Sequence, residues 1–169
     1  LDHWFDPALR LFEDADFFIR LALAGARMAW LRESVSVYRL HPDNSARAGQ
    51  ALGEAYYQVL EKVFARPDLP AEVQARRGQI YAHFHLSLGG RAFSYRQPRV
   101  AQYHLLRAVM YDAAYVEGEF ARVMARFAGF AGAAPEPYLD YAFAHLPAPL
   151  QRFQTYRPQA SALAQRALA

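Results

Sequence analysis

Prolines divide most of this sequence into segments whose apolar residues recur at helical spacing. From residue 47 onward apolar side chains repeat every three or four positions, as in amphipathic helices that pack on one another. A proline ends such a helix because it lacks a backbone N–H and clashes with the preceding turn. The predicted helices span residues 52–65, 71–95, 98–111, 117–129, 138–145 and 159–168. We expect a mainly α domain built as a bundle of antiparallel helical hairpins.

The N-terminal part of the sequence has a different pattern. Apolar residues at helical spacing predict a helix over residues 13–24, and Gly25 follows as the left-handed residue that ends it. Two stretches rich in β-branched and aromatic residues come next, at 26–31 and 34–40. This composition predicts two strands joined in a hairpin.

A cluster of Pro, Asp, Asn, Ser and Gly over residues 41–49 favours turns, and the composition of the chain changes there. We therefore place a domain boundary near residue 46. The predicted fold is a short α/β segment, helix plus β-hairpin, over residues 1–46, followed by a helical domain over residues 47–169.

Composition and charge exclude several classes of function. Of 169 residues, 54% are hydrophobic, which is enough for a core, and the absence of cysteine excludes disulfides and thiolate metal sites. The net charge of +3 is too small to indicate a nucleic-acid partner. The sequence has no stretch of about 18 apolar residues and no signal-peptide pattern. We expect a soluble, cytoplasmic chain, with peripheral membrane association as the other option.

Three acids, Glu13, Asp14 and Asp16, lie at the start of the first predicted helix. Aspartate is a good N-cap, and each acid in a first turn contributes about 0.3–1 kcal/mol through the helix dipole. Asp16 and Arg20 are four residues apart, which suits a surface ion pair. The spacing alone therefore favours helix stabilisation, and leaves open whether one carboxylate also performs chemistry.

Further motifs surround these acids. In order along the chain they are Phe5-Asp6-Pro7, Glu13-Asp14, Arg20-Leu21, Gly25, Tyr38-Arg39-Leu40-His41 and Asn44-Ser45. This order resembles the acceptor-side half of bacterial family-two glycosyltransferases, which are inverting enzymes with the A-type fold. The resemblance implies transfer of a sugar from a nucleotide-diphosphate donor to a glycan or a lipid-linked acceptor.

The resemblance also implies roles for four residues. Asp14 matches the general base, with Glu13 as the other member of the catalytic pair, and we expect the Asp14 carboxylate to be solvent-accessible. His41 matches a ligand of a divalent metal, Mn²⁺ or Mg²⁺, and an imidazole suits Mn²⁺ better; the alternative is an exposed turn residue before proline. Arg39 would bind a phosphate of the donor, or pair with a neighbouring acid.

The nucleotide-binding half of that family, with its Asp-x-Asp motif, has no counterpart in this sequence. We therefore expect the C-terminal portion of a longer transferase, inactive alone and without a cofactor of its own. An α/β segment without its other half would expose apolar side chains such as Trp4, Phe5, Phe17 and Trp30, which favours self-association.

The helical part carries three weaker signals. Leu88 and Gly89, followed by Ala101, Leu105 and Ala108, resemble one tetratricopeptide hairpin, without a second copy. His83 and His85 diverge by about 200° on a helix, so together with His104 they do not predict a shared metal.

Residues 73–111 contain arginines, aromatic residues and no acid. This segment is either a solvated outer face or a surface for an anionic partner. The alternative function is therefore a helical interaction module that docks a partner protein or an acidic surface.

Overall fold

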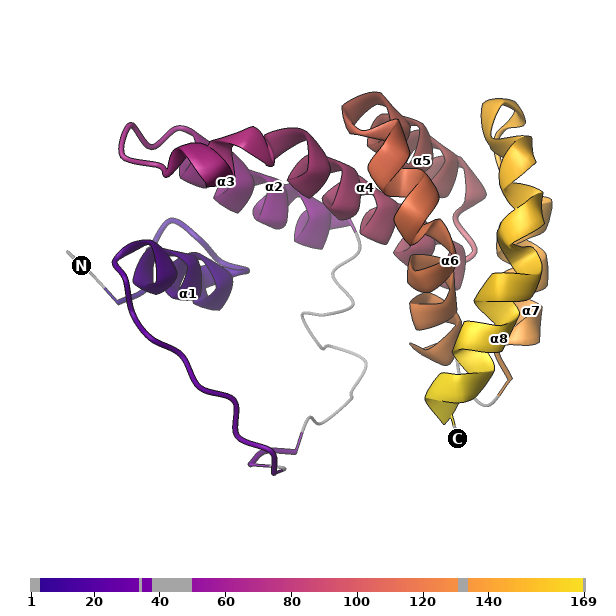
Figure 1. The fold of residues 1–169 in the computed structure, drawn as a ribbon, viewed down its shortest axis with the longest axis horizontal. Helices are drawn as coiled ribbons and strands as arrows, with labels where there is room; N and C mark the ends of the chain where they lie inside the picture. The colour runs from indigo at the N-terminus through magenta and orange to yellow at the C-terminus, as the bar shows by residue number, and fades with distance from the viewer. Residues whose placement is uncertain (1–3, 34, 38–49, 131–133, 169) are drawn as a thin grey trace. The chain divides into compact units, whose positions relative to one another are not determined.

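The computed structural model describes residues 4–33, 35–37, 50–130 and 134–168, and these residues form helices joined by turns (Figure 1). The helices are α1 Glu13–Leu23, α2 Gln50–Phe64, α3 Ala71–Ala75, α4 Arg77–Ser94, α5 Pro98–Tyr111, α6 Ala113–Phe130, α7 Glu136–Ala144, the 3₁₀ helix η2 Ala148–Tyr156, and α8 Arg157–Leu168. The chain divides into two compact units, Leu1–Gln74 and Ala75–Ala169. The expected mainly helical fold is confirmed for the described residues.

In the second unit, α4 and α5 form an antiparallel hairpin. The start of α4 lies beside the end of α5, because a Cβ on Gly78 would come within 3.1 Å of the Tyr111 carbonyl oxygen. Nearer the turn, a Cβ on Gly89 would come within 2.8 Å of Leu105 Cδ2. A side chain at position 89 would therefore displace Leu105, which is fully buried. The predicted hairpin is confirmed, and its tetratricopeptide character stays a prediction.

The turn between α4 and α5 uses an unusual residue. Arg96 adopts a left-handed conformation with φ 57°, and its N–H and that of Gln97 donate to the carbonyls of Phe93 and Ala92. These two bonds are the Schellman pattern that commonly ends a helix with glycine. The Arg96 guanidinium lies 4.2 Å from the centroid of the Tyr141 ring. This cation–π contact offsets part of the backbone strain.

The core of the second unit forms where α6, α7, η2 and α8 meet. The Phe120 ring on α6 is fully buried and lies 4.7 Å from the Phe153 ring of η2 and 5.8 Å from the Phe143 ring of α7. The buried Tyr138 hydroxyl donates to the Gly90 carbonyl oxygen at 2.8 Å, which ties α7 to α4. The helices α6, α7 and α8 lie side by side around this core (Figure 1).

The first unit contains α1 and α2. Helix α1 ends as predicted, with Gly25 at φ 82° and with Schellman bonds from Gly25 N to Ala22 O and from Ala26 N to Leu21 O. The side of α1 that is buried was not predicted. The apolar stripe stays partly exposed, and the buried residues of the helix are Asp16 and Arg20.

The expected β-hairpin is not seen. Residues 26–33 and 35–37 contain no strand, and Trp30 and Val37 are 89% and 95% exposed. A two-stranded hairpin is marginally stable unless other residues cover one of its faces, and these side chains are exposed. The rest of the second predicted strand lies outside the described residues, as does the boundary predicted near residue 46.

Candidate functional site

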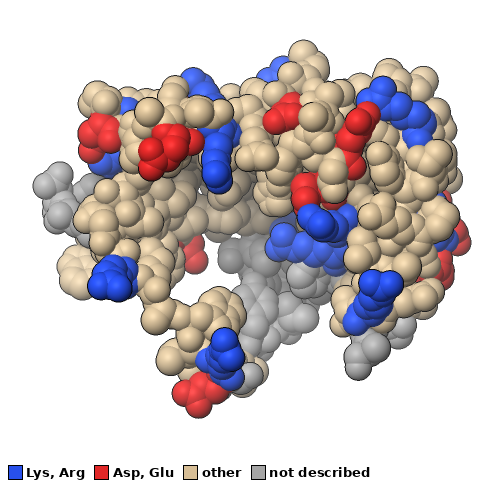
Figure 2. Space-filling view, viewed as in Figure 1, with Lys and Arg blue, Asp and Glu red and all other residues tan. Residues whose placement is uncertain are grey.

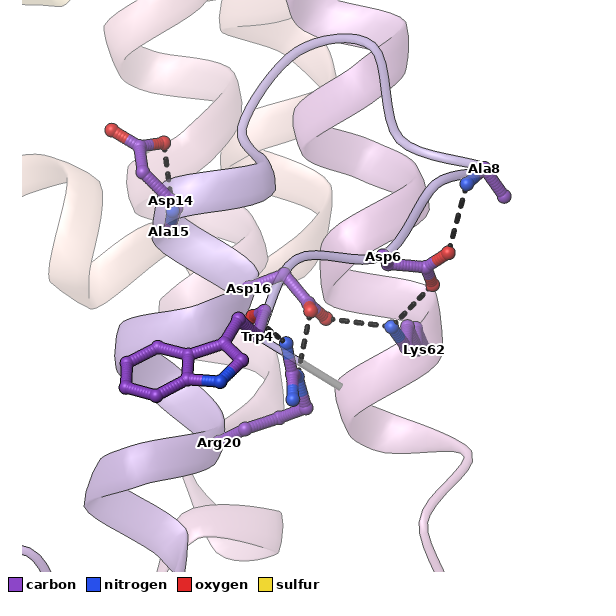
Figure 3. Close-up of polar contacts among 8 residues, drawn as sticks. All are labelled: Trp4, Asp6, Ala8, Asp14, Ala15, Asp16, Arg20 and Lys62. Carbon is purple, nitrogen blue, oxygen red and sulfur yellow. Dashed lines mark hydrogen bonds and ion pairs between the residues drawn. The ribbon is translucent and has the colours of Figure 1, made fainter. Parts of the chain in front are cut away.

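A buried ionic network joins α1 to α2 in the first unit. Asp16 is 1% exposed; the Arg20 Nε donates to its Oδ2 at 2.8 Å, and the Lys62 Nζ lies 2.9 Å from its Oδ1 (Figure 3). The Lys62 Nζ also donates to Asp6 Oδ2 at 2.7 Å. Both oxygens of the buried carboxylate therefore have a cationic partner, which compensates for the loss of hydration.

The same network holds the N-terminal segment. The Arg20 Nη2 donates to the Trp4 carbonyl oxygen at 2.7 Å. Asp6 accepts from the Ala8 backbone N at 2.9 Å, which closes a turn at the Phe5-Asp6-Pro7 motif. One acid of that motif is therefore structural.

The predicted ion pair of Asp16 and Arg20 is confirmed. The prediction that this pair lies on the surface was wrong, because both side chains are buried. The partner that sequence analysis missed is Lys62, which is 56 residues from Asp6 in the chain. The signal that could have suggested it is the position of Lys62 among the apolar residues that α2 buries, Val59, Leu60, Val63 and Phe64.

The charge of Lys62 is stabilised by its two partners. Burial lowers its pKa, but the hydrogen bonds and charges of Asp6 and Asp16 outweigh burial, so the pKa lies above its ordinary value. Lys62 is therefore a cation at neutral pH, as the two carboxylates require.

Asp14 lies apart from this network. Its carboxylate is exposed and points away from Asp16, and its Oδ1 accepts from the Ala15 backbone N at 2.7 Å (Figure 3). Among the described residues no cation pairs with Asp14. The predicted exposure of the Asp14 carboxylate is confirmed, and Glu13 beside it is half-buried.

The residue before these acids is strained. Phe12 is the N-cap of α1, with φ 60° and no side-chain capping bond, so the interpretation of an aspartate as the N-cap was wrong. A bulky residue in this left-handed region costs about 1–3 kcal/mol, and such residues cluster at functional sites. The Phe12 ring packs on Tyr56 of α2, with centroids 4.9 Å apart, and this contact holds the turn that leads into Asp14.

Large apolar side chains are exposed around the start of this unit. Trp4, Phe5 and Trp30 are 76%, 53% and 89% exposed, as the sequence predicted. Phe17 is half-buried, because Trp4 and Phe5 pack on it with centroids 5.7 and 5.4 Å away. The self-association that this exposure led us to expect stays a prediction.

Arg39 and His41 lie outside the described residues, so the structure brings together only Glu13 and Asp14 of the four predicted site residues. Within the described ranges, no group of three or more His, Asp or Glu residues could hold a metal ion.

Two histidines of the second unit meet between α4 and α5. The Nδ1 atoms of His85 and His104 are 2.9 Å apart, so one ring donates to the other, and the tautomers decide which ring is the donor. Burial first, and then His104 and Arg107, lower the pKa of His85 to about 4. His83 turns elsewhere, and its Nδ1 lies 2.7 Å from the Tyr115 hydroxyl.

The charges of the second unit are mixed on the face seen in Figure 2, where basic and acidic side chains are interspersed. In the arginine-rich segment, Tyr81, Phe84 and Phe93 belong to the core, whereas Tyr95 and Tyr103 are 42% and 58% exposed. Most of its aromatic residues are therefore structural.

Comparison of the chain with protein-family models, curated proteins and solved structures gave no match. The family resemblance therefore depends on the motifs in residues 5–45. None of the helices in the described ranges is long and apolar enough to cross a membrane.

Proposed function

We propose that this chain is the C-terminal portion of an inverting, nucleotide-sugar-dependent glycosyltransferase, and that Asp14 is its acceptor-side general base. The observation that carries the proposal is the difference between Asp14 and the two other aspartates near it in the sequence, Asp6 and Asp16. Asp6 and Asp16 are held in ion pairs with Lys62, whereas Asp14 is exposed at the start of a helix. An acid held in a buried pair has no free oxygen for a substrate, and Asp14 has one.

The geometry of Asp14 suits a general base. The Ala15 N–H holds Oδ1, which leaves Oδ2 for the hydroxyl of an acceptor. As the hydroxyl oxygen bonds to the anomeric carbon with inversion, its proton moves to Asp14 and the bond to the nucleotide diphosphate breaks. The ionic network fixes α1, and so limits the movement of the base.

Glu13, Arg39 and His41 complete the proposed site. Glu13 would lie beside the acceptor, and Arg39 would bind a donor phosphate through its planar guanidinium. His41 would be a ligand of Mn²⁺ or Mg²⁺, which neutralises the charge of the leaving diphosphate.

The exposed apolar residues of the first unit support the proposal that an α/β nucleotide-binding half packs against it. Trp4, Phe5 and Trp30 would pack against the nucleotide-binding half of the enzyme. In that setting we propose that residues 26–31 and 34–40 form the strands that the sequence predicts, because a neighbouring sheet would then cover them.

Two assays test this proposal. The 169-residue chain alone should give no heat in calorimetry with uridine, guanosine and thymidine diphosphate sugars plus Mn²⁺. The protein that also carries a nucleotide-binding half should release nucleoside diphosphate in an acceptor-dependent reaction. Micromolar binding by the chain alone would show that the donor site has been misplaced, and absence of transfer with every sugar would refute the function.

A further inference from the structure

The outer side of α5 carries an apolar stripe. Its members are exposed to different degrees: Val100 44%, Tyr103 58%, Leu106 36% and Met110 74%. Steps of three, three and four residues place them on one side of the helix, over about 15 Å. The residues that α5 buries against its neighbours are Ala101, Leu105 and Ala108.

Two arginines of α5 lie on the same side of the helix as this stripe. Arg99 is exposed on the same side of α5, and Arg107 lies beside Leu106, with its Nη2 donating to the Tyr111 hydroxyl at 3.1 Å. The sequence has no acid between residues 73 and 111. The next acid, Asp112, accepts from the Tyr115 backbone N at 2.9 Å and serves the start of α6. The α5 stripe is therefore apolar, with the exposed Arg99 and the half-buried Arg107 on its side of the helix and no acid between residues 73 and 111.

We propose that the α5 stripe docks on an anionic membrane surface. An amphipathic helix of this kind lies in the interface plane, with its apolar residues between the headgroups and its arginines near the phosphates. Tyrosine favours this depth, because its ring is apolar and its hydroxyl is polar.

The shape and charge of the stripe favour a membrane over a protein. The stripe is the convex side of a single helix, so it fits a flat surface and needs no groove. The same surface of a second copy of this chain would offer these arginines no acid, because residues 73–111 contain none. The proposal concerns the second unit alone and does not depend on the glycosyltransferase activity.

Vesicle binding tests the proposal. The protein should bind vesicles of phosphatidylcholine with phosphatidylserine, and should bind pure phosphatidylcholine vesicles at least tenfold more weakly. Raising the salt concentration should reduce binding, because exposed charges are screened. The neutral variant Arg99→Gln should weaken binding about fivefold, as expected for one basic residue near an anionic surface.

Matched variants assign the binding to the stripe. Tyr103→Glu combined with Met110→Glu should abolish binding, and both residues are exposed, so helicity by circular dichroism and the thermal midpoint should be retained. Ala162→Glu combined with Ala167→Glu, at two exposed positions of α8, adds the same two negative charges elsewhere and should bind like the unmodified protein.

Three results would overturn the proposal. They are absence of binding to anionic vesicles, equal binding by the Tyr103→Glu/Met110→Glu variant, and binding to an acidic amphipathic peptide with none to vesicles. The last result would assign the stripe to an acidic protein partner.

Discussion

The Asp16→Asn substitution should destabilise the first unit strongly. It keeps the size of the side chain but removes the charge that pairs with Arg20 and Lys62. Loss of one partner from a buried ion pair costs about 3–5 kcal/mol, because the remaining charge stays buried and unpaired. Lys62 is 37% exposed and keeps Asp6 as a partner, so the lower end applies. We expect a loss of about 3 kcal/mol in the free energy of unfolding.

The assay can separate the two units. Both tryptophans of the chain lie in the first unit. Trp4 packs on Phe17 of α1, so its fluorescence during urea unfolding reports the loss of that contact, whereas Trp30 is 89% exposed and should change little. Circular dichroism follows the helices of both units. Asp14→Asn is the matched control: its carboxylate is exposed and holds one backbone bond, so the change should be about 1 kcal/mol or less.

Equal destabilisation by Asp16→Asn and Asp14→Asn would refute this reasoning. An unchanged urea midpoint of the fluorescence transition in the Asp16→Asn variant would also refute it, because other contacts would then hold α1.

Three further predictions concern the second unit. Because the pKa of His85 falls from 6.5 to about 4 on folding, the unfolded state binds more protons between these values, and His85 should contribute a loss of about 3 kcal/mol in stability as the pH drops through this range. Burial also lowers the pKa of His83 and His104, so His85→Gln should reduce this pH dependence in urea titrations without abolishing it. Gly90→Ala should lower the free energy of unfolding by about 1–3 kcal/mol, and the thermal midpoint with it, because the new Cβ would come within 2.5 Å of Phe127 Cδ2. Gly118→Ala, with open space around the new Cβ, should raise the midpoint. Tyr138→Phe should cost about 1–3 kcal/mol in chemical unfolding, because the Gly90 carbonyl loses its buried donor, and an unchanged midpoint would contradict that bond.

Sequence analysis located helices well where local chemistry sets their ends. Helix α5 has the predicted bounds, because Pro98 is favoured at a first helical position. Gly25 likewise ends α1 as predicted. The predicted helix over 71–95 instead breaks at Arg76, where φ is −89° and ψ 5°. Gly78 is two residues further on, inside α4, and the spacing of the apolar residues did not reveal the break. The 3₁₀ helix η2 was missed because Pro147 and Pro149 suggested a gap between helices.

The candidate site was predictable only in part. The spacing of Asp16 and Arg20 predicts their pairing, but spacing carries no information on burial, which here depends on Lys62 from a distant helix. The hairpin shows the same limit: β-rich composition predicts strands, whereas their formation requires a neighbouring surface. Local sequence does not distinguish the exposed Asp14 from the buried Asp16, because both lie in the first turn of α1.

The most direct test of the account is the rate of sugar transfer by the Asp14→Asn variant of the protein that carries a nucleotide-binding half. Asparagine keeps the shape of the side chain but accepts no proton, so we expect a fall of about 10²–10⁴-fold in turnover, with donor binding and thermal midpoint unchanged. Glu33→Gln, an exposed carboxylate outside the motifs, is the control and should leave the rate unchanged. Near-normal turnover by Asp14→Asn would contradict the assignment of Asp14 as the general base.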